Sequence, residues 1–125
     1  MKTLFHLLVI LIAVGFISCG ESNPGENITV LVRYKTQPNK NIDAVNALKT
    51  LMEKVEKEDH FVRISIYIDP ADNSNILLHE EWDNEEYYRN EHMNTEHLQL
   101  FMKNSQDFLA GPPEITYWRV NSVYK

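Results

Sequence analysis

The residues best suited to chemistry in this chain lie between positions 80 and 97. The stretch contains Trp82, Tyr88, His92 and His97. A histidine with an ordinary pKa of about 6.5 can accept a proton at neutral pH. A tyrosine hydroxyl can donate a hydrogen bond, and an indole can form the wall of an aromatic pocket. The stretch is therefore a candidate for acid–base catalysis, for a metal site, or for an ordinary junction between a strand and a helix.

Each of these residues also has a structural interpretation, which for Tyr88 is an ordinary surface tyrosine. Trp82 shares a strand face with Leu78, so it is either a core residue or a pocket wall. His97 shares a helical face with Phe101, which favours a buried, hydrogen-bonded histidine. His92 lies where the predicted helix is interrupted, and there it can cap a neighbouring carbonyl as readily as it can catalyse.

A metal site is not predicted from this stretch. His92 and His97 are five residues apart, about 140° around a continuous helix, unlike the four-residue spacing of a zinc-binding pair. The interruption in the helix could bring them together with His79 or Glu81 as a third ligand. Those two side chains, however, are expected on the sheet face opposite Trp82.

Charge and composition exclude other classes of protein. The formal charge is −6, and the lysines and arginines are scattered, which argues against nucleic-acid binding. With only four glycines, the chain has no phosphate-binding glycine loop. Acidic residues gather in one run, expected to be mostly a solvated face and a helix N-terminus: Glu80, Glu81, Asp83, Glu85 and Glu86.

The N-terminal segment is typical of a secreted protein. Lys2 precedes an apolar run over residues 4–17, shorter than the roughly 20 residues of a membrane span, which predicts a signal peptide over residues 1–18. The end of the run resembles a bacterial lipobox. We therefore expect Cys19, the single cysteine, to be lipidated, with residues 19–27 tethering the protein to the cell-envelope membrane. An uncleaved N-terminal anchor is the alternative.

Residues 28–125 show the periodicities of one α+β domain. Two-residue alternation predicts strands over residues 28–35, 61–69, 75–82 and 115–124. Three- and four-residue spacing predicts a helix from Ile42 to Val55 and a second helical stretch over residues 85–109, interrupted near Met93. The order β-α-β-β-α-β predicts a ferredoxin-like fold, with four antiparallel strands and both helices on one face.

The face of the sheet opposite the helices is expected to carry exposed apolar side chains. Its predicted members are Leu31, Phe61, Tyr67, Leu77 and Trp118. In the second strand, the alternation groups Val62 with Ile64, Ile66 and Ile68 on one face. An apolar face of this size predicts a homodimer that associates through its sheets.

The spaced residues Trp82, Tyr88, His92 and His97, together with the helix stop at residues 111–113, resemble the antibiotic biosynthesis monooxygenase family. The resemblance implies a ferredoxin-like domain that dimerises into an α/β barrel. Members of this family include oxygenases of quinols and anthrones that need no cofactor, heme-degrading enzymes, isomerases, and proteins without known activity.

Two branches of the family can be compared with this chain residue by residue. Trp82 and Tyr88 match the anthrone-type oxygenases, but Leu78 stands where that branch usually has an asparagine. Val32 and Phe101 stand where the heme-degrading branch has its asparagine and its iron-binding histidine, which argues against heme degradation.

The resemblance implies a cofactor-independent monooxygenase acting on a quinol-like aromatic with O₂. Its expected catalytic residues are Tyr88, His92 and His97, and its expected substrate-binding residues are Trp82, Leu78 and Phe101. The alternative is a non-catalytic lipoprotein of the same fold that binds a small molecule.

Overall fold

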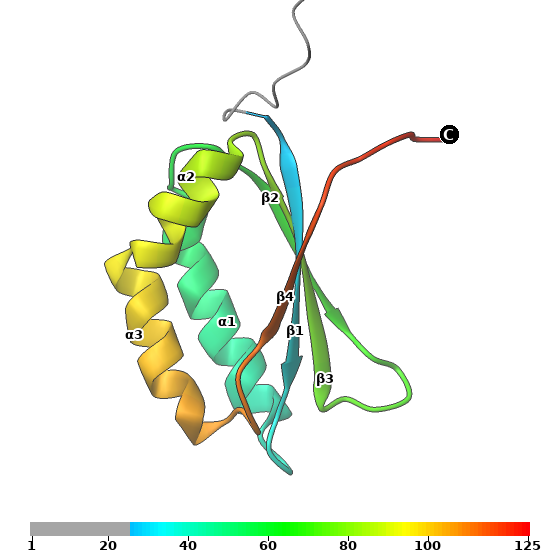
Figure 1. Cartoon of the computed structure of the whole chain (residues 1–125). Helices are drawn as coiled ribbons and strands as arrows, with labels where there is room; N and C mark the ends of the chain where they lie inside the picture. Colours follow the sequence, from blue (N-terminus) through cyan, green and yellow to red (C-terminus); the bar gives the residue numbers. More distant parts are fainter. Residues whose placement is uncertain (1–25) are drawn as a thin grey trace, which may run out of the picture.

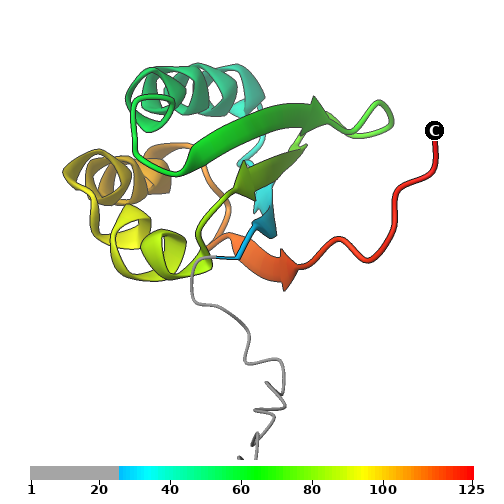
Figure 2. The same cartoon turned by 90° about the horizontal axis from the view of Figure 1, so that it is seen from above.

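The computed structural model describes residues 26–125, so the predicted signal peptide, Cys19 and most of the tether lie outside the described residues. A four-stranded sheet carries all of the helices on one face (Figures 1 and 2). The elements follow the predicted order: β1 (Ile28–Lys35), α1 (Asn41–Val55), β2 (Phe61–Ile68), β3 (Asn75–Trp82), α2 (Glu85–Asn90), η1 (His92–Asn94), α3 (Glu96–Asn104), η2 (Ser105–Asp107) and β4 (Glu114–Trp118). The predicted α+β, ferredoxin-like fold is confirmed. Within residues 26–125, no helix has the length and apolarity that crossing a membrane requires.

The sheet is antiparallel, with strand order β2-β3-β1-β4. The two central strands pair along their whole length, from Ile28 opposite Trp82 to Lys35 opposite Asn75. Because side chains alternate across a strand, this register places every second residue of both strands beneath the helices. The residues at those positions are buried: Ile28, Val30, Val32 and Tyr34 of β1, and Ile76, Leu78, Glu80 and Trp82 of β3.

The start of β2 departs from the predicted alternation. Phe61 pairs with Trp82 and Arg63 pairs with Glu81, so Val62 is an extra residue in a β-bulge. A bulge shifts the alternation by one residue. The Phe61 ring therefore packs edge-on against Trp82 at 5.7 Å between centroids, and Val62 is half exposed. The predicted outer position of Phe61, and the grouping of Val62 with Ile64, are both wrong for this reason.

The second helical region is broken as predicted. The Asn84 side chain accepts a hydrogen bond from the Tyr87 backbone N–H at 2.9 Å and so caps α2. Thr95 stands at the N-cap position of α3, but its hydroxyl donates to the His92 carbonyl oxygen at 2.8 Å instead of capping the helix. This contact turns the chain between η1 and α3. The last strand is shorter than predicted and ends at Trp118.

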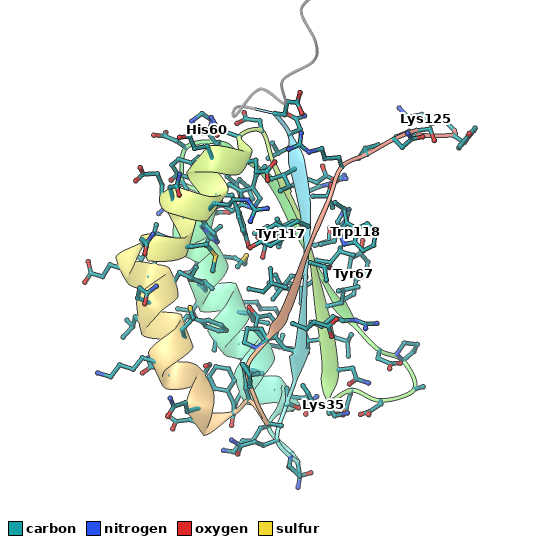
Figure 3. All side chains as sticks on the ribbon, in the orientation of Figure 1. Lys35, His60, Tyr67, Tyr117, Trp118 and Lys125 are labelled. Atoms are coloured by element: carbon teal, nitrogen blue, oxygen red, sulfur yellow. The ribbon has the colours of Figure 1, made fainter. Side chains whose placement is uncertain are left out.

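The outer face of the sheet carries exposed apolar side chains. Tyr67 and Trp118 are 51% and 55% exposed, and Figure 3 shows both on the side of the sheet away from the helices. A partly apolar sheet face of this kind favours association with a second copy.

We expect the chain to form a dimer through this face and to bury more than about 1,000 Å² in total. Light scattering at micromolar concentration should give the dimer mass for the wild type. It should give the monomer mass for Tyr67→Lys combined with Trp118→Lys, because two charges would then face each other across the interface. Leu100→Lys, at an exposed position on α3, is the control and should remain dimeric. A monomeric wild type would contradict the expectation.

Candidate functional site

A small cavity lies between the sheet and the broken helical region. Its volume is about 40 Å³. Most of its wall is apolar, built from β1, β3, β4 and the segments from α2 to η2. Four titratable side chains also line it: Tyr34, Glu80, Tyr88 and His92. A mostly apolar cleft or cavity with a few convergent polar groups is the usual form of a small-molecule site.

Glu80 is the acid of this cavity. Only 4% of the residue is exposed, and the Trp82 indole N–H donates a hydrogen bond to Glu80 Oε2 at 3.0 Å. Burial raises the pKa of Glu80 to about 7, and the negative charge of Glu58 acts in the same direction, against the lowering effect of the Trp82 hydrogen bond. Grouping Glu80 with the solvated acidic run was wrong. Its shared strand parity with Trp82 was the signal that could have shown this.

His92 is the basic group of the cavity. Its Nδ1 lies 3.0 Å from Glu58 Oε2 and 3.1 Å from Glu58 Oε1. Because an ionised carboxylate only accepts hydrogen bonds, Nδ1 carries the proton, and in the neutral ring Nε2 is left as the acceptor. No described residue forms a hydrogen bond to Nε2. Burial lowers the pKa of His92, although the neighbouring Glu58 raises it in part. The imidazole is therefore neutral at pH 7.

Glu58 holds the helical layer together. It lies in the turn between α1 and β2, and its side chain is almost fully buried. Besides His92, it accepts hydrogen bonds from His97 Nε2 and, at 3.3 Å, from the Tyr87 hydroxyl. The role of Glu58 was not predicted from the sequence, because a residue in a turn belongs to no periodic pattern and its partners lie 29 to 39 positions away.

Aromatic rings surround His92. The centroid of its ring lies 4.5 Å from that of Trp82, and it stacks on Tyr88 at 4.9 Å. The Tyr88 hydroxyl forms no hydrogen bond with any residue of the described segment. Burial, and then the nearby Glu80, raise the pKa of Tyr88. Its hydroxyl therefore keeps its proton and remains a hydrogen-bond donor.

The structure brings some of the predicted site residues together and separates others. Tyr88, His92 and Phe101 line the cavity. Trp82 lies behind Tyr88 and His92, and Leu78 is packed in the core.

His97 lies apart from that site. It lines a separate groove of about 290 Å³ between α1 and α3, with its side chain 26% exposed. Among residues 26–125, no group of three or more His, Cys, Asp or Glu side chains is arranged to hold a metal ion.

On this ferredoxin-like, α+β scaffold, a buried acid and a buried histidine therefore line one aromatic cavity. Residues 27–104 match the family model described as antibiotic biosynthesis monooxygenase. The chain belongs to this family, as the resemblance in its sequence predicted.

Three similar proteins place the chain among its relatives. A Synechocystis protein described as uncharacterized is 27% identical over 74% of this chain, and the chain spans 63% of its length. A conserved protein from Methanosarcina mazei superposes with a TM-score of 0.69 at 22% identity, covering 77% of this chain and 94% of the other. A Nitrosomonas europaea protein, provisionally named an antibiotic biosynthesis monooxygenase, gives a TM-score of 0.71 at 18% identity, covering 78% and 92%. At these identities, the two solved structures support the fold alone.

The raised pKa of Glu80 predicts a pH-dependent stability. Between pH 4.5, the ordinary pKa of a glutamate, and about pH 7, the folded state binds more protons than the unfolded state. The contribution of Glu80 to the free energy of unfolding therefore falls as pH rises through this window, by up to about 3 kcal/mol, whereas the lowered pKa of His92 contributes in the opposite direction. Glu80→Gln keeps an oxygen acceptor for Trp82 but cannot ionise, so its free energy of unfolding should lack this fall. Urea denaturation from pH 4 to 8 measures the difference, with the more exposed Glu81→Gln as control. Parallel profiles for wild type and Glu80→Gln would show that Glu80 has an ordinary pKa.

Proposed function

We propose that the chain is a monooxygenase that acts on a small phenolic substrate of the quinol or anthrone type, using O₂ and no cofactor. The observation that carries this proposal is the state of His92. It is buried in an aromatic cavity, its Nδ1 is held by Glu58, and its Nε2 is free to accept a proton. Membership of the antibiotic biosynthesis monooxygenase family supports the same class of reaction.

The first step is the removal of a proton from the substrate. A phenolic hydroxyl gives its proton to His92 Nε2, and the negative charge of Glu58 offsets the imidazolium that forms. The resulting phenolate is electron-rich and can transfer one electron to O₂ directly. The Tyr88 hydroxyl is available to donate a hydrogen bond to the phenolate oxygen, and the apolar wall excludes water, which strengthens both interactions.

The cavity as it stands is too small for such a substrate. Its volume of about 40 Å³ compares with about 300 Å³ or more for pockets that hold organic ligands. Met93 and Met102 line it, and their unbranched side chains repack easily. Both come from the broken helical region, so we expect the substrate to displace these methionines as it enters.

A second candidate function is binding without catalysis. One observation favours it: Leu78 stands where the anthrone-type branch of the family has an asparagine. In this case the family fold would serve a small-molecule carrier or receptor.

Oxygen uptake with a panel of quinols and anthrones separates the two functions. His92→Gln keeps a donor for Glu58 but loses the base, and Tyr88→Phe loses only the hydroxyl. Each should lower turnover about tenfold to a thousandfold, while the unfolding midpoint changes little. His60→Gln is the matched control, because His60 also pairs with a carboxylate, Asp83 at 2.7 Å, but at the surface.

The opposite expectation holds for His97. His97→Ala removes a partner of the buried Glu58 without reaching the cavity, so it should lower stability more than turnover. Wild-type turnover in both His92→Gln and Tyr88→Phe would contradict the proposed mechanism. Ligand binding without any oxygen uptake by the wild type would favour the binding function.

We also propose that lipid on Cys19 tethers the domain to the bacterial cell envelope. The support is the N-terminal sequence, in which an apolar run ends in a lipobox-like segment. In a bacterial host, the wild type should incorporate a radiolabelled fatty acid and sediment with membranes, and Cys19→Ala should lose the label. Equal labelling of both forms would exclude lipidation at this position.

A further inference from the structure

Glu80 has no counter-charge. The ion pairs among residues 26–125 do not include it. An ionised carboxylate buried without a partner is costly, so the neutral acid is the favoured form. The titratable or polar groups that act on it from the surrounding elements are Tyr34 of β1, Trp82 of β3, Tyr88 of α2 and Glu58 of the α1–β2 turn. His92 of η1 lines the same cavity.

The hydrogen bonds of the described residues engage only one oxygen of the Glu80 carboxyl group. The Trp82 N–H occupies Oε2, so this oxygen acts as an acceptor and the proton belongs on Oε1. Within the described segment, Oε1 has no hydrogen-bond partner, and Glu80 lines the same cavity as His92. Trp82 contacts both groups, because its indole N–H bonds to Glu80 and its ring packs on His92. An acid and a base therefore flank one indole at one small cavity.

We propose that Glu80 is a second catalytic residue, a carboxylic acid that protonates the peroxide formed on the substrate and then removes the proton from the same ring carbon. The assignment rests on the function proposed above and adds the second half of its reaction. It requires a substrate with a hydrogen atom on the carbon that is oxidised, such as a phenol with a free para position.

The proposed reaction balances in atoms and in charge. His92 takes the hydroxyl proton, and the phenolate and O₂ combine through one-electron transfer to form a carbon–oxygen bond and a peroxide anion. Glu80 gives its proton to the distal oxygen. The Glu80 carboxylate then takes the ring proton as the O–O bond breaks, which leaves a carbonyl. The departing hydroxide takes the proton from His92 and becomes water. Phenol and O₂ thus give quinone and water, and both residues return to their starting states.

The experiment compares Glu80→Gln, Glu80→Asp and Glu81→Gln with the wild type, using the full chain and a para-unsubstituted phenol. Glu80→Gln cannot donate a proton, so quinone formation should fall about a hundredfold, with the Kd of the phenol changed less than about threefold. Glu80→Asp keeps the carboxyl group and should recover part of the rate. Glu81→Gln alters a carboxylate that pairs with Arg63 and should match the wild type.

The pH dependence of turnover distinguishes a catalytic role of Glu80 from a purely structural one. Because the acid form is required, wild-type turnover should decline as pH rises above about 7, the value expected for Glu80. The residual turnover of Glu80→Gln should lack this decline. Deuterium at the para position should slow the wild type, because Glu80 breaks that bond to hydrogen.

The outcomes distinguish this inference from the function on which it rests. If His92→Gln is inactive but Glu80→Gln keeps wild-type turnover, the role of Glu80 is overturned and the oxygenase function stands. A decline above pH 7 that persists in Glu80→Gln overturns it in the same way. If the wild type oxidises quinols or anthrones but no para-unsubstituted phenol, the role of Glu80 is overturned and the oxygenase function stands; if it oxidises none of these substrates, both proposals are overturned together.

Discussion

A single buried carboxylate, that of Glu58, organises the helical layer above the sheet. It accepts hydrogen bonds from Tyr87 of α2, His92 of η1 and His97 of α3. Each hydrogen bond to a charged group contributes about 1.5–3 kcal/mol, and here they connect three short helical pieces to the turn that follows α1. Since α2 and η1 are too short to be stable alone, this connection fixes where the broken region lies over the sheet.

The cavity depends on the same arrangement. Glu58 holds His92 against the rings of Trp82 and Tyr88, and Trp82 in turn donates its N–H to Glu80. These contacts thus hold a basic nitrogen, that of His92, and a carboxylic acid, that of Glu80, at the same apolar cavity. Their environments act on their pKa values in opposite directions: burial lowers that of His92 and raises that of Glu80. Both groups are consequently favoured in their neutral forms, which suits an exchange of protons with a neutral substrate.

The sequence predicted the elements well and the site only in part. Two-residue alternation predicted the first and last residues of β1 and β3 correctly, because both strands are central and each has one buried face. The bulge at Val62 was not predicted, because the alternating pattern of β2 fits the strand register before the bulge as well as the register after it. The burial of Glu80 could have been predicted, because Glu80 lies on the same strand face as Trp82. The position of Glu58 could not, because only tertiary contacts bring this residue of a turn beside His92, 34 positions away.

The proposed reaction requires that His92 presents an unprotonated Nε2 to the cavity while its Nδ1–H bonds to Glu58. Nitrogen-15 NMR of the histidine-labelled protein measures this directly, because the two ring nitrogens have different shifts when protonated and when free. At pH 7, the spectrum should show one buried histidine in the neutral Nδ1–H form, and this signal should be absent from His92→Gln. A His92 that is protonated on Nε2 at this pH would have no acceptor facing the cavity, and the proposed base would be contradicted.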